Sequence, residues 1–167
     1  EEMVGKAFET KRQKVFIQTK VHVHDEKKMR ASVERSLKRL RTDYVDVLVW
    51  HGHSSPEEVS DPRLFEFMSK MKKEGKTRFI GFSSHKHMAS LLREAAKSNF
   101  HDIALISYNF THSNDLKEAV ALAAKSGIGI VASDDHEAIE KAKVVYDALY
   151  TNCKLKLIRD EHKKEIE

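Results

Sequence analysis

The sequence predicts one α/β domain: a parallel sheet of about six strands with helices on both faces. Short apolar runs alternate with amphipathic segments along most of the chain, the order expected of right-handed strand–helix–strand units. The runs contain few polar residues, as in strands covered on both faces. A closed eight-stranded barrel needs about 250 residues. We therefore expect a partial TIM barrel or a flavodoxin-like doubly wound sheet.

The strands are predicted at six apolar runs, residues 15–19, 45–50, 78–82, 103–108, 128–132 and 155–158. The opening residues, 1–11, have a helical pattern, and residues 29–41 place an apolar stripe on one helix face. Asp61 and Pro62 predict the start of a helix that continues to Glu74 and ends at Gly75. Three later helices are predicted from the stripes Met88, Leu91, Leu92 and Ala95; Leu116, Val120 and Ala123; and Ile139, Ala142, Tyr146 and Leu149.

The composition is that of a globular protein with 40% apolar and 34% charged residues. The net charge of +4 is small, and basic residues alternate with acidic ones, which argues against a nucleic-acid partner. No segment resembles a signal peptide or reaches membrane-spanning length, and Cys153 stands alone, so we expect a cytoplasmic protein without a membrane partner. A half-open barrel would expose apolar interior side chains, which favours flattening of the sheet or self-association.

Histidines follow or end the apolar runs and are therefore expected at the carboxyl edge of the sheet, where α/β proteins place their sites. They are His22, His24, His51, His53, His85, His87, His112 and His136. Three pairs spaced i, i+2, with Asp134 and Asp135, suggest a metal-binding module as one hypothesis. The alternative is a row of solvated loop residues. Pairs on separate strands need not meet, so no metal ligand is assigned.

Several segments carry a family resemblance. VFIQTKV, RASVERSLKRLRTDYVDVLVWHGH and GKTRFIGFSSH resemble the third strand, the next helix and strand, and the G-K-x-R-x-I-G-x-S segment of aldo-keto reductases. The resemblance covers about residues 1–132. Residues 133–167 form an unrecognised tail with one helix and one strand predicted. We expect an internal fragment of the family, either an engineered or recombined chimera or a natural truncated relative.

The resemblance implies NADPH-dependent carbonyl reduction as the ancestral chemistry. Lys20 and His51 match two members of the family's catalytic tetrad, Ser83 matches the serine that holds the nicotinamide carboxamide, and Ser84 stands where many members have asparagine. The tetrad aspartate and tyrosine and the phosphate-binding loops have no counterpart in the matched segments. We therefore expect a catalytically inactive domain that does not bind NADPH. The alternative is a structural or engineered scaffold without a catalytic role.

Overall fold

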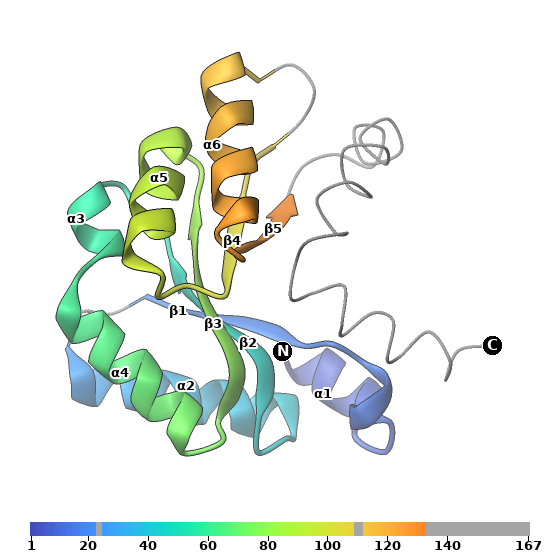
Figure 1. The fold of residues 1–167 in the computed structure, drawn as a ribbon. Helices are drawn as coiled ribbons and strands as arrows, with labels where there is room; N and C mark the ends of the chain where they lie inside the picture. Colours follow the sequence, from blue (N-terminus) through green and yellow to red (C-terminus); the bar gives the residue numbers. More distant parts are fainter. Residues whose placement is uncertain (23–24, 109–111, 133–167) are drawn as a thin grey trace. The chain divides into compact units, whose positions relative to one another are not determined.

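Five parallel-sheet strands follow one another in the chain and in the sheet (Figure 1). The computed structural model describes residues 1–22, 25–108 and 112–132. The strands are β1 (Gln18–Val21), β2 (Val45–His51), β3 (Thr77–Ser84), β4 (Ile103–Ile106) and β5 (Gly129–Ala132). Their order is β1-β2-β3-β4-β5, and the pairs β1–β2 and β4–β5 are parallel. The sixth predicted strand and the last predicted helix lie outside the described residues.

This strand order separates the two predicted architectures. A doubly wound sheet reverses its strand order at a switch point, whereas a barrel adds each strand beside the one before it. The described strands are sequential without a reversal. The prediction of an α/β parallel sheet is therefore confirmed, and the topology is that of a partial TIM barrel.

The described residues also form six helices and one 3₁₀ turn. They are α1 (Glu2–Phe8), η1 (Arg12–Lys14), α2 (Glu26–Leu40), α3 (Pro56–Val59), α4 (Pro62–Lys73), α5 (Met88–Ser98) and α6 (Asn114–Lys125). The predicted start of α4 is confirmed, because the Asp61 side chain accepts a hydrogen bond from the Arg63 amide and Pro62 is the first helical residue. None of the described helices is long and apolar enough to cross a membrane.

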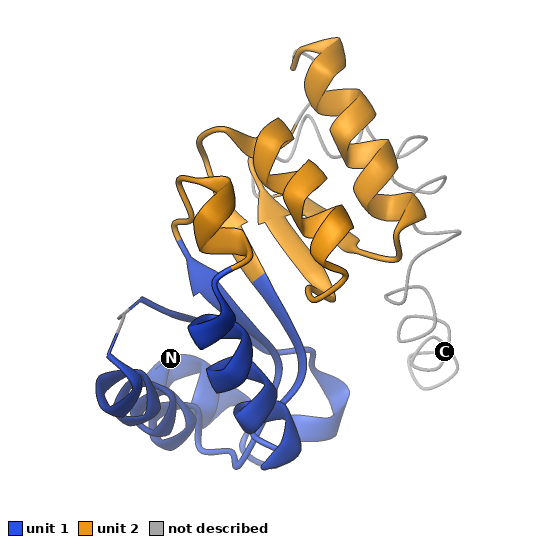
Figure 2. Cartoon of the chain, turned by 60° about the vertical axis from the view of Figure 1, so that its left-hand side comes forward, with its two compact units in different colours: residues 1–51, 61–81 blue, residues 52–60, 82–167 orange. Residues whose placement is uncertain are grey.

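Contacts divide the chain into two compact units (Figure 2). Unit 1 comprises residues 1–51 and 61–81, and unit 2 comprises residues 52–60 and those from 82 onward. Val33, Leu37, Val47, Phe67 and Met71 are among the buried residues of unit 1; Leu91, Leu92, Ile106, Ala119 and Ala123 are among those of unit 2. Strand β3 contributes residues to both units, so one boundary between the units falls inside a strand and not in a loop. Whether the whole chain is one domain stays a prediction.

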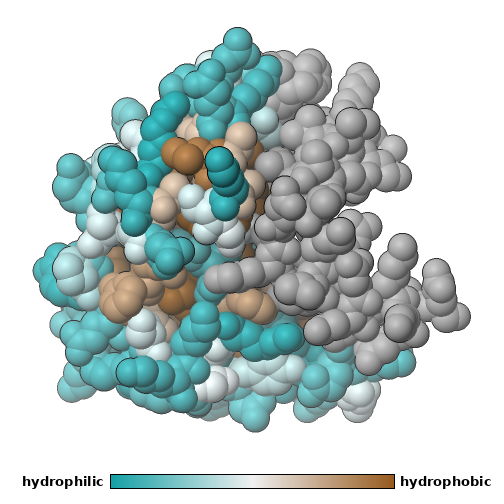
Figure 3. All heavy atoms as spheres, in the orientation of Figure 1, coloured by the Kyte–Doolittle hydropathy of each residue, from teal (hydrophilic) through white to brown (hydrophobic). Residues whose placement is uncertain are grey.

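The surface of the described residues is mostly hydrophilic on the face that Figure 3 shows. Large apolar side chains that remain exposed in the described part are Met3, Val4, Phe16, Phe65 and Leu122. Single exposed apolar residues of this kind are normal for a globular protein.

A buried carboxylate ties the starts of the unit 1 strands together. Asp46 is 2% exposed. Its Oδ2 accepts hydrogen bonds of 2.8 Å from both the Ile17 amide and Arg12, and its Oδ1 lies 3.1 Å from an Arg78 guanidinium nitrogen. The Ile17 amide thus bonds to a side chain and not to a strand backbone. This is why the first strand begins at Gln18, three residues later than predicted.

Candidate active site

Lys20 and His51 both lie at the carboxyl ends of neighbouring strands in unit 1. The register pairs Lys20 with Val49 and Val21 with Trp50, and His51 is the last residue of β2. The residues on either side of Lys20, Thr19 and Val21, are buried, while Lys20 is exposed because side chains alternate along a strand. Among the described residues no carboxylate lies within ion-pair distance of Lys20. The lysine therefore presents its charge at the edge of the sheet.

His22 contacts the backbone of His51. Its Nδ1 lies 3.0 Å from the His51 carbonyl oxygen, so this nitrogen carries the proton and donates it. The two rings meet edge to face with centroids 5.6 Å apart. Of the predicted histidine row, these two residues are brought together in unit 1, while His24 lies outside the described residues.

In unit 2, the loop after β2 is fastened to the end of β3. The amides of Gly52 and His53 each donate a 3.0 Å hydrogen bond to the Ser83 carbonyl oxygen, and the Gly52 amide also lies 3.3 Å from the Ser83 hydroxyl. Gly52 adopts a φ of 82°, which a residue with a side chain rarely takes, and this turn lets the two amides face β3. The loop and the strand end are thereby held in one arrangement.

The hydroxyl of Ser84 also forms hydrogen bonds that hold this loop against the end of β3. It lies 2.6 Å from the His53 carbonyl oxygen and 2.8 Å from that of Lys86, and it accepts a hydrogen bond from the Lys86 amide at 3.1 Å. Ser83 and Ser84 are each only 1% exposed. A serine hydroxyl has a single hydrogen to donate, and for Ser84 two backbone carbonyls already compete for it.

His53 follows the carboxyl end of β2, but its side chain is buried, contrary to the alternative of a row of solvated loop residues. It is 2% exposed and packs against Phe82 and His101, at ring-centroid distances of 5.6 and 6.4 Å. Its Nδ1 lies 3.6 Å from a carboxylate oxygen of Glu58. Hydrogen bonds from the Ser54 backbone lower the pKa of that carboxyl, although burial opposes the shift. The turn at Gly52 explains the difference, because it directs the following side chain into unit 2.

His101 was not singled out from the sequence, yet it belongs to the same buried cluster. Its Nε2 donates a 2.8 Å hydrogen bond to the Val59 carbonyl oxygen, and its Nδ1 has no hydrogen-bond partner among the described residues. Burial lowers the pKa of His101 to about 4, so the ring is neutral at pH 7. A buried neutral imidazole with this environment is a structural side chain of unit 2.

The remaining histidines do not form a metal centre in the described part of the chain. His85 and His87 are exposed in the segment before α5, and His112 stacks on Tyr108 at 6.0 Å. Across residues 1–22, 25–108 and 112–132, no three His, Cys, Asp or Glu side chains are grouped so that they could hold a metal ion. His136, Asp134 and Asp135 lie outside the described residues.

Two tyrosines lie in the described part of the chain, and the Arg12 guanidinium lies 4.1 Å from the centroid of the Tyr44 ring. Tyr44 precedes β2, at the opposite end of that strand from His51, and its hydroxyl bonds to Gln13 at 3.1 Å. Burial raises the pKa of Tyr108, which makes its hydroxyl a weaker acid.

The aldo/keto reductase family model matches residues 1–134, most of the chain. The chain belongs to the aldo/keto reductase family. It is 39% identical over 75 residues to the methylglyoxal reductase DkgB of Escherichia coli O157:H7, covering 44% of this chain and 28% of that enzyme. The chain thus spans well under half of this curated relative, and half of the Yersinia pestis methylglyoxal reductase DkgB.

Solved aldo-keto reductases share the fold. The apo form of an aldo-keto reductase from Bacillus halodurans has a TM-score of 0.66 at 27% identity and covers 78% of this chain and 44% of its own. An aldo/keto reductase from Klebsiella pneumoniae in complex with NADP and acetate has a TM-score of 0.55 at 22% identity and covers 89% of this chain and 69% of its own. Both likenesses support the partial-barrel topology of the aldo/keto reductase chain described here.

Proposed function

We propose that this chain is the part of an NADPH-dependent carbonyl reductase that supplies the catalytic lysine and histidine, and that its 167 residues alone do not reduce carbonyl compounds. The observation that supports the first half is the register of β1 and β2, which brings Lys20 and His51 to the same edge of unit 1. Members of the family generally use NADP(H), which supplies the hydride.

Lys20 and His51 can each contribute one effect to carbonyl reduction. An exposed ammonium at the sheet edge stabilises negative charge on a nearby phenolate or carbonyl oxygen. An imidazole at the end of the neighbouring strand can donate a hydrogen bond to a carbonyl oxygen and orient it. His22 adds a positioning contact, because its ring holds the backbone of His51.

Ser84 does not fit the nicotinamide as it stands. It is buried, and its hydroxyl already faces two carbonyl oxygens of the loop and strand end. A cofactor contact from Ser84 would have to replace a 2.6 Å hydrogen bond to His53. These hydrogen bonds of Ser84 support the inactive half of the proposal.

The test is a titration of the purified chain with NADPH, followed through nicotinamide fluorescence, together with a turnover assay on methylglyoxal. We expect no saturation up to about 1 mM, which corresponds to less than about 4 kcal/mol of binding free energy, and no aldehyde-dependent NADPH oxidation. Micromolar binding with turnover that disappears in Lys20→Met but persists in Lys86→Met would contradict inactivity and establish a working reductase.

The assignment of Lys20 and His51 is tested separately by segment exchange. The matching segment of the E. coli methylglyoxal reductase is replaced by the corresponding residues of this chain. We expect the hybrid to retain activity and to lose about 10²–10⁴-fold in kcat on Lys20→Met or His51→Ala, the usual range for proton-transfer groups. A hybrid equally active with and without both side chains would show that they have no catalytic role.

A further inference from the structure

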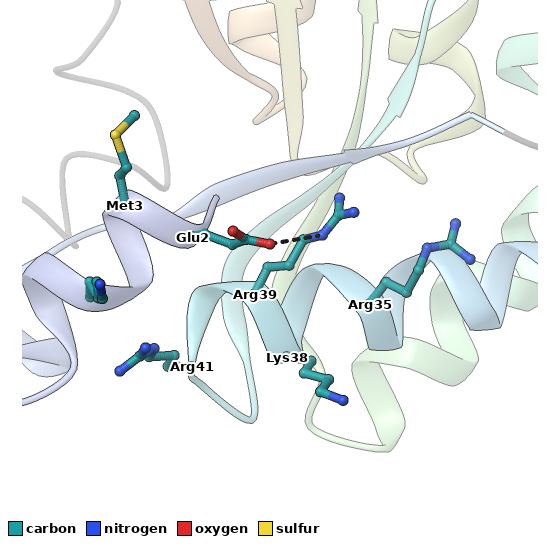
Figure 4. Close-up of a pocket in the computed structure, with 7 residues that line it drawn as sticks. Glu2, Met3, Arg35, Lys38, Arg39 and Arg41 are labelled. Carbon is teal, nitrogen blue, oxygen red and sulfur yellow. Dashed lines mark ion pairs between the residues drawn. The ribbon is translucent and has the colours of Figure 1, made fainter.

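A basic hollow lies between α1 and the second half of α2 in unit 1 (Figure 4). It has a volume of about 580 Å³ and is lined by Glu2, Met3, Lys6, Arg35, Lys38, Arg39 and Arg41. Arg41 follows α2 and leads into the start of β2, whereas His51 ends that strand. The basic hollow is therefore at the other end of β2 from His51.

The hollow concentrates the charge of the chain. Five of its lining residues are cationic and one is a carboxylate, an excess of four positive charges. The net charge of the whole chain is also +4, so all other residues together are formally neutral. The sequence shows alternating charges, but folding brings Lys6 beside cations that are some thirty residues away along the chain.

Stabilisation of helix α2 explains the presence of only some of these cations. Arg35 is spaced i, i+3 from Lys38 and i, i+4 from Arg39, so it repels both of them. Lys38 and Arg39 lie in the last turn of α2, where the helix dipole favours cations. That argument does not extend to Arg35, which lies earlier in the helix, or to Lys6 on α1.

Three of the cations have no anionic partner in the described structure. Arg41 pairs with Glu9 at 2.7 Å, and Arg39 lies 3.7 Å from Glu1 and 3.8 Å from Glu2. Lys6, Arg35 and Lys38 form neither an ion pair nor a side-chain hydrogen bond with any described residue. The Glu2 side chain is 80% exposed and its contact to Arg39 is long, so it can be displaced at little cost.

We propose that the basic hollow binds a compact anion that carries two or more phosphate groups. Guanidinium groups match phosphate oxygens with paired hydrogen bonds, and the hollow has the volume of a small-molecule site. Its cations project from two elements, as Figure 4 shows for α2 and for the residue after it, so a single phosphate would reach only some of them. Linked phosphates can contact the cations of both helices at once.

The experiment is calorimetric titration of the full chain with inorganic tripolyphosphate at low ionic strength. We expect the double variant Arg35→Ala/Lys38→Ala to bind about tenfold more weakly, as loss of one to two charge-assisted hydrogen bonds implies. The matched control is Lys27→Ala/Lys28→Ala, which removes the same charge from exposed residues of the first turn of α2, outside the hollow. It should bind like the unaltered chain.

A second variant tests whether affinity for tripolyphosphate rises when an anionic side chain of the hollow is removed and all cations are kept. Glu2→Gln deletes the carboxylate of the hollow and should tighten binding several-fold, because the ligand no longer displaces an anion. Equal weakening in the two double variants would show that tripolyphosphate responds to net charge alone, and it would overturn the proposal. Tight binding of a DNA duplex of about two helical turns that tripolyphosphate cannot displace would also overturn it, in favour of a nucleic-acid surface.

Discussion

At the scale of single residues, His101 couples the stability of unit 2 to pH. The pKa of His101 is lowered by burial to about 4, whereas an unfolded chain has a histidine pKa near 6.5. Between these values the unfolded chain binds the proton and the folded chain does not. The contribution is therefore fully present above pH ~6.5 and is lost as the pH falls toward 4, by up to about 3 kcal/mol.

The prediction is tested by urea unfolding at pH values from 7 down to about 4. His101→Phe removes the titrating group and keeps a ring in the cluster with Phe82. As pH falls, the free energy of unfolding should therefore decrease more for the unaltered chain than for His101→Phe. The control His85→Gln changes an exposed histidine and should leave the pH dependence unchanged. Parallel curves for the unaltered chain and His101→Phe would refute the argument.

Sequence reasoning places Lys20 and His51 at one sheet edge because strand ends are readable from apolar runs. It does not reveal that the His53 side chain is buried, because spacing cannot show that Gly52 takes a φ of 82° and turns the next side chain inward. It also misses the basic hollow, because Lys6 and Arg35 meet only after α1 packs on α2. Local patterns thus identify positions along strands, while contacts between distant elements require the fold.

At the scale of elements, Gly5 decides how α1 packs on α2. A Cβ atom at this position would lie 2.7 Å from the Leu40 carbonyl carbon and closer still to the Arg39 carbonyl oxygen. Replacing glycine by alanine inside an exposed helix usually stabilises it by about 1 kcal/mol. Here the clash is with backbone, which cannot rotate away, so the sign is reversed.

We expect Gly5→Ala to lower the free energy of unfolding by about 1–3 kcal/mol, the usual cost of overpacking. The measurement is chemical denaturation followed by circular dichroism. Ala7→Ser, an exposed change of similar size on the same helix, serves as the control and should be within about 0.5 kcal/mol of the unaltered chain. A stabilised Gly5→Ala variant would mean that α1 does not pack there in solution.

Helices with strong end signals were predicted well from the sequence, and short elements were not. The Asp61–Pro62 start of α4 and the apolar stripes of α2, α5 and α6 correspond to real helices. The missed elements, η1 and α3, have three and four residues and depend on tertiary contacts more than on an apolar stripe. The start of the first strand depends on a similar tertiary contact. The Ile17 amide bonds to the Asp46 side chain, 29 positions away, and the apolar pattern of residues 15–19 cannot show this.

At the scale of the whole molecule, β3 links the two compact units. Residues 77–81 of this strand belong to unit 1 and residues 82–84 to unit 2. A strand that frays in one unit loses support in the other, so we expect the described part of the chain to unfold in one cooperative transition. Trp50, the single tryptophan of the chain, lies in unit 1.

A buried substitution in unit 2 should therefore shift the tryptophan signal of unit 1. Leu92→Ala removes a fully buried side chain of α5 and should lower the free energy of unfolding by about 2–5 kcal/mol. We expect Trp50 fluorescence and far-ultraviolet circular dichroism to move together to the same lower urea midpoint. Leu122→Ala on the exposed side of α6 is the control, and an unchanged Trp50 midpoint in Leu92→Ala would show that the units unfold independently.

The sequential strand order has a consequence for synthesis on the ribosome. Each strand of the described sheet pairs with the strand made just before it, so the growing chain can extend one free sheet edge as it emerges. Growth stays at that one edge, whereas a doubly wound order moves growth to the other edge of the sheet at its switch point. Pairing partners also stay close along the chain, which keeps the entropy of loop closure low. A segment of this topology can therefore assemble in the same direction in which it is translated.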